Sequence, residues 1–189
     1  MKSQITFLIL IPLWLISAIG CDDMLRDNLL IIDSVSAFEY AIDSRDVTYS
    51  ETERLNLQSV INDIDGDVED VTFYNITMFV KNIYDSSPQT SISGQLRVRP
   101  AGASQSEPLV NFSNITFEDF AKERSIFSGE LPGITVVPGA IQTLLNYYQQ
   151  KPAPVVDFTV SGTISRAGNE DNVKFDFVVK LYTQMATDP

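Results

Sequence analysis

The sequence predicts a mainly β fold, namely an antiparallel β-sandwich with two or three short helices. Several segments alternate apolar and polar residues with the period of two that a half-buried strand requires. Turn-forming residues separate these segments, and the regular strand–helix alternation of a parallel sheet is absent from the sequence. The alternative is an α+β arrangement in which a helix over 138–150 packs across one antiparallel sheet.

The predicted strands follow one another through most of the chain. They cover residues 35–43, 70–82, 90–99, 108–112, 155–165 and 173–185. Segment 70–82 is β-branched and aromatic on both faces, which is typical of a central strand. Segment 90–99 alternates cleanly, so Arg97 and Arg99 point outward on the same side. Residues 85–88 contain turn formers, and they predict a hairpin that joins these two strands.

The last third of the chain has the clearest alternation. Apolar side chains occupy every second position over much of 155–165 and of 173–185, and the polar residues 166–172 separate the two runs. This pattern predicts a long antiparallel hairpin with one buried face. Gly162 interrupts the first run, which indicates a bulge or a close approach of another backbone.

Three helices are predicted. Residues 138–150 place apolar side chains at helical spacing, with Pro138 suited to the first turn. Thr116 and Asp119 resemble a capping box before a short helix near 117–124. Residues 56–64 have the apolar spacing of two helical turns.

The composition excludes several kinds of chemistry. The chain has no histidine and one cysteine, Cys21. Without imidazole there is no Ser-His-Asp triad, no Cys-His dyad and no histidine metal site. The sequence also lacks a glycine-rich phosphate loop and a Ser-x-x-Lys motif. We therefore predict no catalytic residues and no cofactor, and an enzyme would be left with carboxylate chemistry.

An acidic cluster is a weak calcium candidate. Asp63, Asp65 and Asp67 alternate around Gly66, and carboxylate oxygens are ligands that calcium prefers. The spacing does not fit an EF-hand loop, because Val68 stands where that loop needs glycine. We favour a simpler interpretation, in which a helix stops here and a solvated turn leads into the next strand.

The charge balance bears on the partners. The chain has 25 acidic and 13 basic residues and a formal net charge of −12. Such a charge repels nucleic acid, so no nucleic-acid partner is expected. Arg97 and Arg99 are candidates for contact with an anionic ligand, although a solvated or salt-bridged sheet face is the favoured interpretation.

The first twenty residues differ from the rest of the chain. Lys2 is their only charge, an apolar run covers residues 5–16, and the small residues 17–20 precede Cys21. This order is typical of a secretory signal peptide. The run is too short and too interrupted for a permanent membrane span, which needs about 20 apolar residues.

The segment Ala18-Ile19-Gly20-Cys21 resembles the lipobox of bacterial lipoproteins, with Ala18 where leucine is commonest. The resemblance implies cleavage between Gly20 and Cys21, a diacylglycerol on the Cys21 thiol and acylation of the new amino terminus. It predicts a signal peptide over 1–20, a lipidated tether over 21–28 and a domain over 29–189. The protein would be exported and anchored to the bacterial cell envelope, on its periplasmic face or at the cell surface. An ordinary signal peptide followed by a chance cysteine is the alternative.

The leading functional hypothesis is a membrane-anchored, non-catalytic binding or structural module that meets another envelope component. Two alternatives remain open. One is a carrier of an apolar ligand held between the sheet and the 138–150 helix. The other is a hydrolase, which requires two acidic side chains about 5–10 Å apart in a cleft.

Substitution of Cys21→Ser is expected to abolish lipid attachment, because serine offers no thiol to the acyl donor. The measurements are incorporation of labelled palmitate and the partition of the full-length protein between membrane and soluble fractions. Equal labelling of wild type and variant would overturn the lipoprotein interpretation.

Overall fold

The computed structural model describes residues 30–188 except for positions 65, 85, 130, 169 and 170. The predicted signal peptide, the cleavage position at Gly20, Cys21 and the tether lie outside the described residues.

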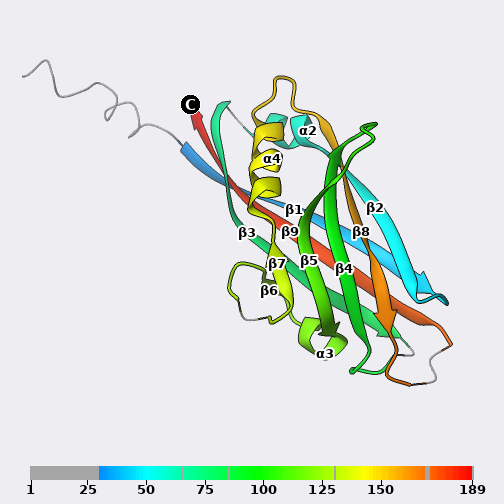
Figure 1. Ribbon diagram of the computed structural model, residues 1–189. Helices are drawn as coiled ribbons and strands as arrows, with labels where there is room; N and C mark the ends of the chain where they lie inside the picture. Colours follow the sequence, from blue (N-terminus) through cyan, green and yellow to red (C-terminus); the bar gives the residue numbers. More distant parts are fainter. Residues whose placement is uncertain (1–29, 65, 85, 130, 169–170, 189) are drawn as a thin grey trace, which may run out of the picture.

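Two antiparallel sheets pack face to face, with short helices at their ends and side (Figure 1). One sheet has four strands in the order β1-β9-β3-β6, and the other has five in the order β2-β8-β4-β5-β7. The elements in chain order are β1 (Leu30–Ser44), β2 (Thr48–Asn56), α2 (Leu57–Asn62), β3 (Asp67–Tyr84), β4 (Ser91–Pro100), β5 (Glu107–Thr116), α3 (Phe117–Phe120), β6 (Arg124–Ser125), β7 (Ile134–Val136), α4 (Pro138–Tyr148), β8 (Val155–Ser165) and β9 (Val173–Asp188). The predicted β-sandwich is confirmed.

Helix α4 does not lie across one sheet. It contacts β3 of the four-stranded sheet and β5 of the five-stranded sheet, so it closes the side between them. Its residues Ala140, Leu144 and Tyr148 are buried against the shared core. The α+β alternative is therefore not the observed arrangement.

The core lies between the two sheets and is rich in aromatic side chains. Phe38 of β1 contacts Phe158 of β8 with ring centroids 4.7 Å apart, and Phe112 of β5 stacks on Phe177 of β9 at 5.6 Å. Each pair joins a strand of one sheet to a strand of the other. The inward positions predicted from alternation are buried, as expected, including Phe38, Tyr40 and Ile42 of β1.

Both predicted hairpins are wrong. Strand β3 pairs with β9 and β6, whereas β4 pairs with β8 and β5, so these two successive strands belong to different sheets. Likewise β8 belongs to the five-stranded sheet and β9 to the four-stranded sheet. Alternation specifies which face of a strand is buried, but a hairpin and a crossing between facing sheets bury the same face.

The predicted helices are present with corrected bounds. Helix α3 spans Phe117–Phe120 and is shorter than expected, with the Thr116 side chain accepting a hydrogen bond from the Asp119 amide at 3.1 Å. Helix α2 begins after Asn56, whose side chain accepts from the amide of Ser59. Within residues 30–188, apart from the five positions not described, no helix combines the length and the apolar character of a membrane span.

Strand β2 was not predicted, because its residues carry almost no apolar alternation. It forms one edge of the five-stranded sheet and pairs only with β8 among the described strands. Glu51 and Glu53 pair with the inward-facing Val160 and Phe158, yet both glutamates are exposed. The core-facing side of this edge strand therefore carries two carboxylates.

Gly94 of β4 and Gly162 of β8 lie opposite each other in the sheet. A Cβ atom on Gly94 would lie 2.2 Å from the Ser161 carbonyl oxygen, and one on Gly162 would lie 2.0 Å from that of Ser93. The predicted close backbone approach at Gly162 is confirmed, and its partner is a second glycine.

Substitution of Gly94→Ala is expected to lower the free energy of unfolding by about 1–3 kcal/mol, because the two strands must separate to admit the methyl group. The matched control is Gly139→Ala in α4, where nothing lies within 4 Å of the added Cβ. The control should change stability by less than about 1 kcal/mol. Chemical denaturation of both variants measures the difference, and equal effects would contradict the close-approach argument.

Candidate functional site

The outer face of the five-stranded sheet is polar. Alternation and register place on it Ser50, Thr52 and Arg54 of β2, Asp157, Thr159, Ser161 and Thr163 of β8, Ser93, Gln95, Arg97 and Arg99 of β4, and Asn111 of β5. This set holds three arginines and one carboxylate, in a chain whose overall charge is −12. We call the group formed by Arg54, Arg97, Arg99 and Asp157 the arginine cluster.

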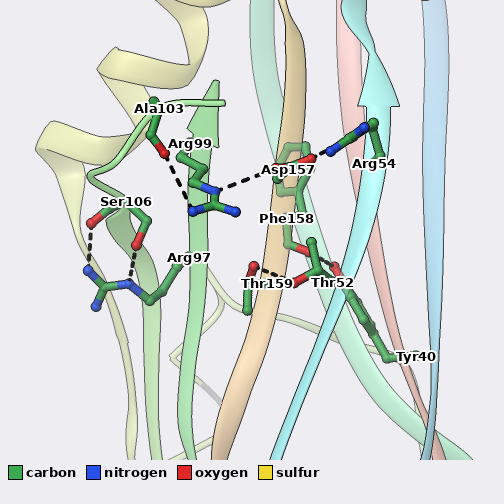
Figure 2. Close-up of polar contacts among 10 residues, drawn as sticks. All are labelled: Tyr40, Thr52, Arg54, Arg97, Arg99, Ala103, Ser106, Asp157, Phe158 and Thr159. Atoms are coloured by element: carbon green, nitrogen blue, oxygen red, sulfur yellow. Dashed lines mark hydrogen bonds and ion pairs between the residues drawn. The ribbon is translucent and has the colours of Figure 1, made fainter. Parts of the chain in front are cut away.

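Asp157 is the centre of the arginine cluster (Figure 2). Its side chain is only 3% exposed, and its Oδ1 accepts a hydrogen bond from Nε of Arg54 at 2.7 Å. Nε of Arg99 lies 3.5 Å from Oδ2, which is an ion-pair contact. The two arginines come from β2 and β4, on either side of β8. One buried carboxylate therefore orients guanidinium groups on both neighbouring strands.

Arg97 is held separately, through the loop that follows β4. Its Nε donates to the Ser106 hydroxyl at 2.8 Å (Figure 2). One of its terminal nitrogens donates to Oε1 of Gln95 at 2.7 Å. Arg99 also donates to the carbonyl of Ala103 at 3.4 Å. Arg97 and Arg99 therefore lie on the same side of β4, as predicted.

In the arginine cluster, the ion pair keeps the carboxyl of Asp157 and the guanidinium of Arg54 in their charged forms. The hydrogen bond from Arg54 holds the pKa of Asp157 below its ordinary value, against an opposing effect of burial. The same hydrogen bond raises the pKa of Arg54. Asp157 is thus a fixed negative charge engaged by cations, and not a proton donor or acceptor near neutral pH.

The contacts within the arginine cluster do not engage every guanidinium nitrogen of Arg54. The side chain of Arg54 is 65% exposed, and within the described part of the chain only its Nε has a polar partner. Terminal guanidinium nitrogens suit carboxylate or phosphate oxygens, since they can donate two parallel hydrogen bonds. The arrangement can bind an anionic group without any chemical step.

A groove of about 730 Å³ lies elsewhere, at the end of the sandwich where β1 begins and β9 ends. We call this end the Leu30 end. The groove lies between α2, the start of β3 and the last turn of α4, with Ile61, Val71 and Tyr148 among its lining residues. Burial raises the pKa of Tyr148 to about 12, so its phenol keeps its proton. Gln58, Asn62 and Lys151 make much of the remaining lining polar.

Of the acidic cluster, Asp67 lines this groove. Asp63 caps the C-terminal end of α2, Gly66 has a φ of +99°, and Asp67 starts β3. Asp65 lies outside the described residues. Among residues 30–188, at the positions that are described, no three acidic side chains form a group that could hold a metal. Helix α2 ends at Asn62 and β3 begins at Asp67, as the favoured interpretation expects. Calcium binding stays a prediction.

Sequence reasoning identified Arg97 and Arg99 but missed Arg54. Pairing between β2 and β8 brings Arg54 beside Asp157, and β2 has no pattern that predicts a strand. Asp157 was expected on the polar face of its strand, but its burial follows from the arginines on both sides.

Substitution of Asp157→Asn is expected to lower stability by about 1–2 kcal/mol near neutral pH, because a charge-assisted hydrogen bond is lost while the exposed Arg54 regains water. A carboxyl with a lowered folded-state pKa stabilises the fold above its unfolded pKa, about 3.9. That contribution is lost as the pH falls through the folded pKa. Melting temperatures of wild type and variant should therefore converge progressively as the pH falls below about 4. The control Asp33→Asn replaces an exposed carboxylate, and near neutral pH it should lower the melting temperature less than Asp157→Asn does. A gap that persists in acid would contradict the assigned pKa direction.

No protein-family description matches the sequence, and no curated protein is significantly similar to it. Among solved structures, the crystal structure of the decameric BFDV capsid protein aligns with 83% of this chain and 98% of that chain, at 10% sequence identity and a TM-score of 0.35. A similarity at this level carries no argument about function or assembly.

Proposed function

We propose that this protein is an exported, lipid-anchored envelope module that binds an anionic envelope component without catalysis. The anchor is supported by the signal-like segment 1–20 and the lipobox-like residues through Cys21. The binding role is supported by the arginine cluster. The envelope component that it binds would carry carboxylate or phosphate groups. That component would contact the outer face of the five-stranded sheet.

The observation that carries the binding proposal is the position of Asp157. A carboxylate that is 3% exposed fixes Arg54 and Arg99 from two strands, so part of the entropy cost of ordering them is met before a ligand arrives. Hydroxyl and amide side chains surround the arginines and can add hydrogen bonds. The net charge of −12 opposes long-range attraction of anions, but charges are screened beyond about 8 Å at physiological ionic strength.

A non-catalytic role is consistent with the chemistry of the described residues. Asp157 is held as an ion, and the cluster offers guanidinium groups in place of a nucleophile or a general base. The chain has no histidine to supply one.

The groove at the Leu30 end supports a second candidate, the apolar-ligand carrier. Its volume of about 730 Å³ falls within the range of small-molecule sites, and Ile61, Ile64 and Val71 contribute apolar surface. Asp67, Glu69 and Asp70 line it as well, so this groove also offers carboxylates to the alternative of a carboxylate hydrolase. Native mass spectrometry of the full-length protein in detergent separates the carrier from the leading proposal, because a carrier retains a ligand mass.

The leading proposal predicts that Arg54→Gln weakens binding to a sulfated polymer. The full-length protein in a non-ionic detergent is titrated with dextran sulfate, and the dissociation constant is measured at two salt concentrations. We expect about a fivefold weaker affinity, because one rim charge contributes about 1 kcal/mol, and we expect wild-type binding to weaken with salt.

The matched control is Lys122→Gln, which removes the same charge from an exposed position outside the sheet face. Neutral dextran tests whether the sugar chain alone is recognised. Equal losses in both variants, or equal binding of neutral dextran, would mean that the arginine cluster is not the binding site.

A further inference from the structure

The outer face of the four-stranded sheet changes character along its length. Near the Leu30 end it exposes large apolar side chains, with Ile31 64%, Val35 52% and Tyr74 46% exposed. Register places Val35 beside Tyr182 and Ile31 beside Ala186, and the rings of Tyr74 and Tyr182 are 5.9 Å apart. We call Ile31, Val35, Tyr74, Tyr182 and Ala186 the apolar patch.

Farther along the same face, ion-paired charged side chains predominate. Phe79 and Val178 lie among them, and Tyr84, which is 59% exposed, lies beside Lys174. Lys180 binds Glu123, Lys81 binds Glu39 and Lys174 binds Asp43, each at 2.6 Å. Glu123 also accepts hydrogen bonds from Tyr182 at 2.7 Å and from Thr77 at 2.8 Å. A solvated sheet face explains this ion-paired half, but it does not explain exposed isoleucine, valine and tyrosine side by side.

We infer that the apolar patch rests on the surface of a lipid bilayer made mainly of zwitterionic lipids. This inference rests on the proposed lipid anchor at Cys21. The chain from Cys21 to Leu30 spans at most about 30 Å when fully extended, so the Leu30 end stays close to the headgroups. The apolar patch begins at Ile31, directly after that segment.

The chemistry of the apolar patch fits the interfacial region of a membrane. Aliphatic side chains gain by leaving water, and tyrosine places its ring among acyl chains while its hydroxyl stays among polar groups. Asp33 points the same way between Ile31 and Val35, and Asp70 pairs with Ala186 in the register. These carboxylates are repelled by anionic headgroups, so the argument favours zwitterionic lipid.

The two outer faces of the sandwich then have different neighbours. The apolar patch belongs to the four-stranded sheet and the arginine cluster to the five-stranded sheet, on opposite outer faces (Figure 1). Contact of the first face with the bilayer turns the second face away from it, where an envelope component can reach it.

Tryptophan substitutions test the inference in the full-length, membrane-assembled protein. Ile31→Trp and Val35→Trp report on the apolar patch. Val47→Trp is the matched control, because Val47 is 60% exposed in the β1–β2 turn at the opposite end of β1 (Figure 1). The wild-type protein supplies the background fluorescence, because its only tryptophan, Trp14, lies in the segment expected to be removed.

The proteins are reconstituted in phosphatidylcholine vesicles with and without brominated acyl chains. We expect fluorescence of the two patch variants to be quenched at least twofold more than that of Val47→Trp, and to shift to shorter wavelength. Adding anionic lipid should reduce this difference.

The outcomes separate the inference from the anchor on which it rests. Palmitate incorporation with equal quenching at all three positions overturns the membrane contact and leaves the anchor standing. Absence of palmitate, with Trp14 fluorescence retained in wild type, overturns the anchor. The third outcome is a dimer in which the tryptophans of the patch variants are quenched neither by a water-soluble quencher nor by brominated lipid. That result would assign the apolar patch to self-association and overturn the membrane contact.

Discussion

The structure depends on the contact between the two sheets through their aromatic side chains. Nearly every long strand has a single apolar face, and that face is removed from water only when the other sheet covers it. Phe38 against Phe158 and Phe112 against Phe177 make this contact across the core. The chain has one cysteine and so no internal disulfide, which leaves packing and hydrogen bonding to hold the sheets together. Helix α4 adds to the same core from the open side.

Because each strand buries one face against the opposite sheet, some parts of the fold can be predicted from the sequence and others cannot. The period of two identifies β8 and β9 and their buried residues, because burial of one face is a local property of each strand. The partners of a strand are not local. A crossing between β8 and β9 needs only a connection long enough to span the roughly 10 Å between packed sheets, and a polar sequence between two strands suits a crossing as well as a hairpin.

The candidate site was predictable to a smaller extent. Alternation correctly placed Arg97 and Arg99 on one side of a strand. It did not indicate that Asp157 would be buried, because that burial arises only when Arg54 and Arg99 cover it from the neighbouring strands. β2 supplies one of those neighbours, and its composition resembles that of a solvated loop. The groove at the Leu30 end likewise forms only when α4, which is distant in sequence, packs beside α2 and the start of β3.

Strand β2 has one more consequence, for how copies of a protein with the proposed lipid anchor would share a membrane surface. Molecules that are confined to a membrane meet one another much more often than molecules free in solution, and an open sheet edge is a template for pairing with another strand. Glu51 and Glu53 occupy core-facing positions of that edge. A neighbouring strand that paired there would enclose two carboxylates against its own apolar face, at a high desolvation cost. The same residues that hide β2 from sequence-based detection thus oppose edge-to-edge pairing between two copies of the protein.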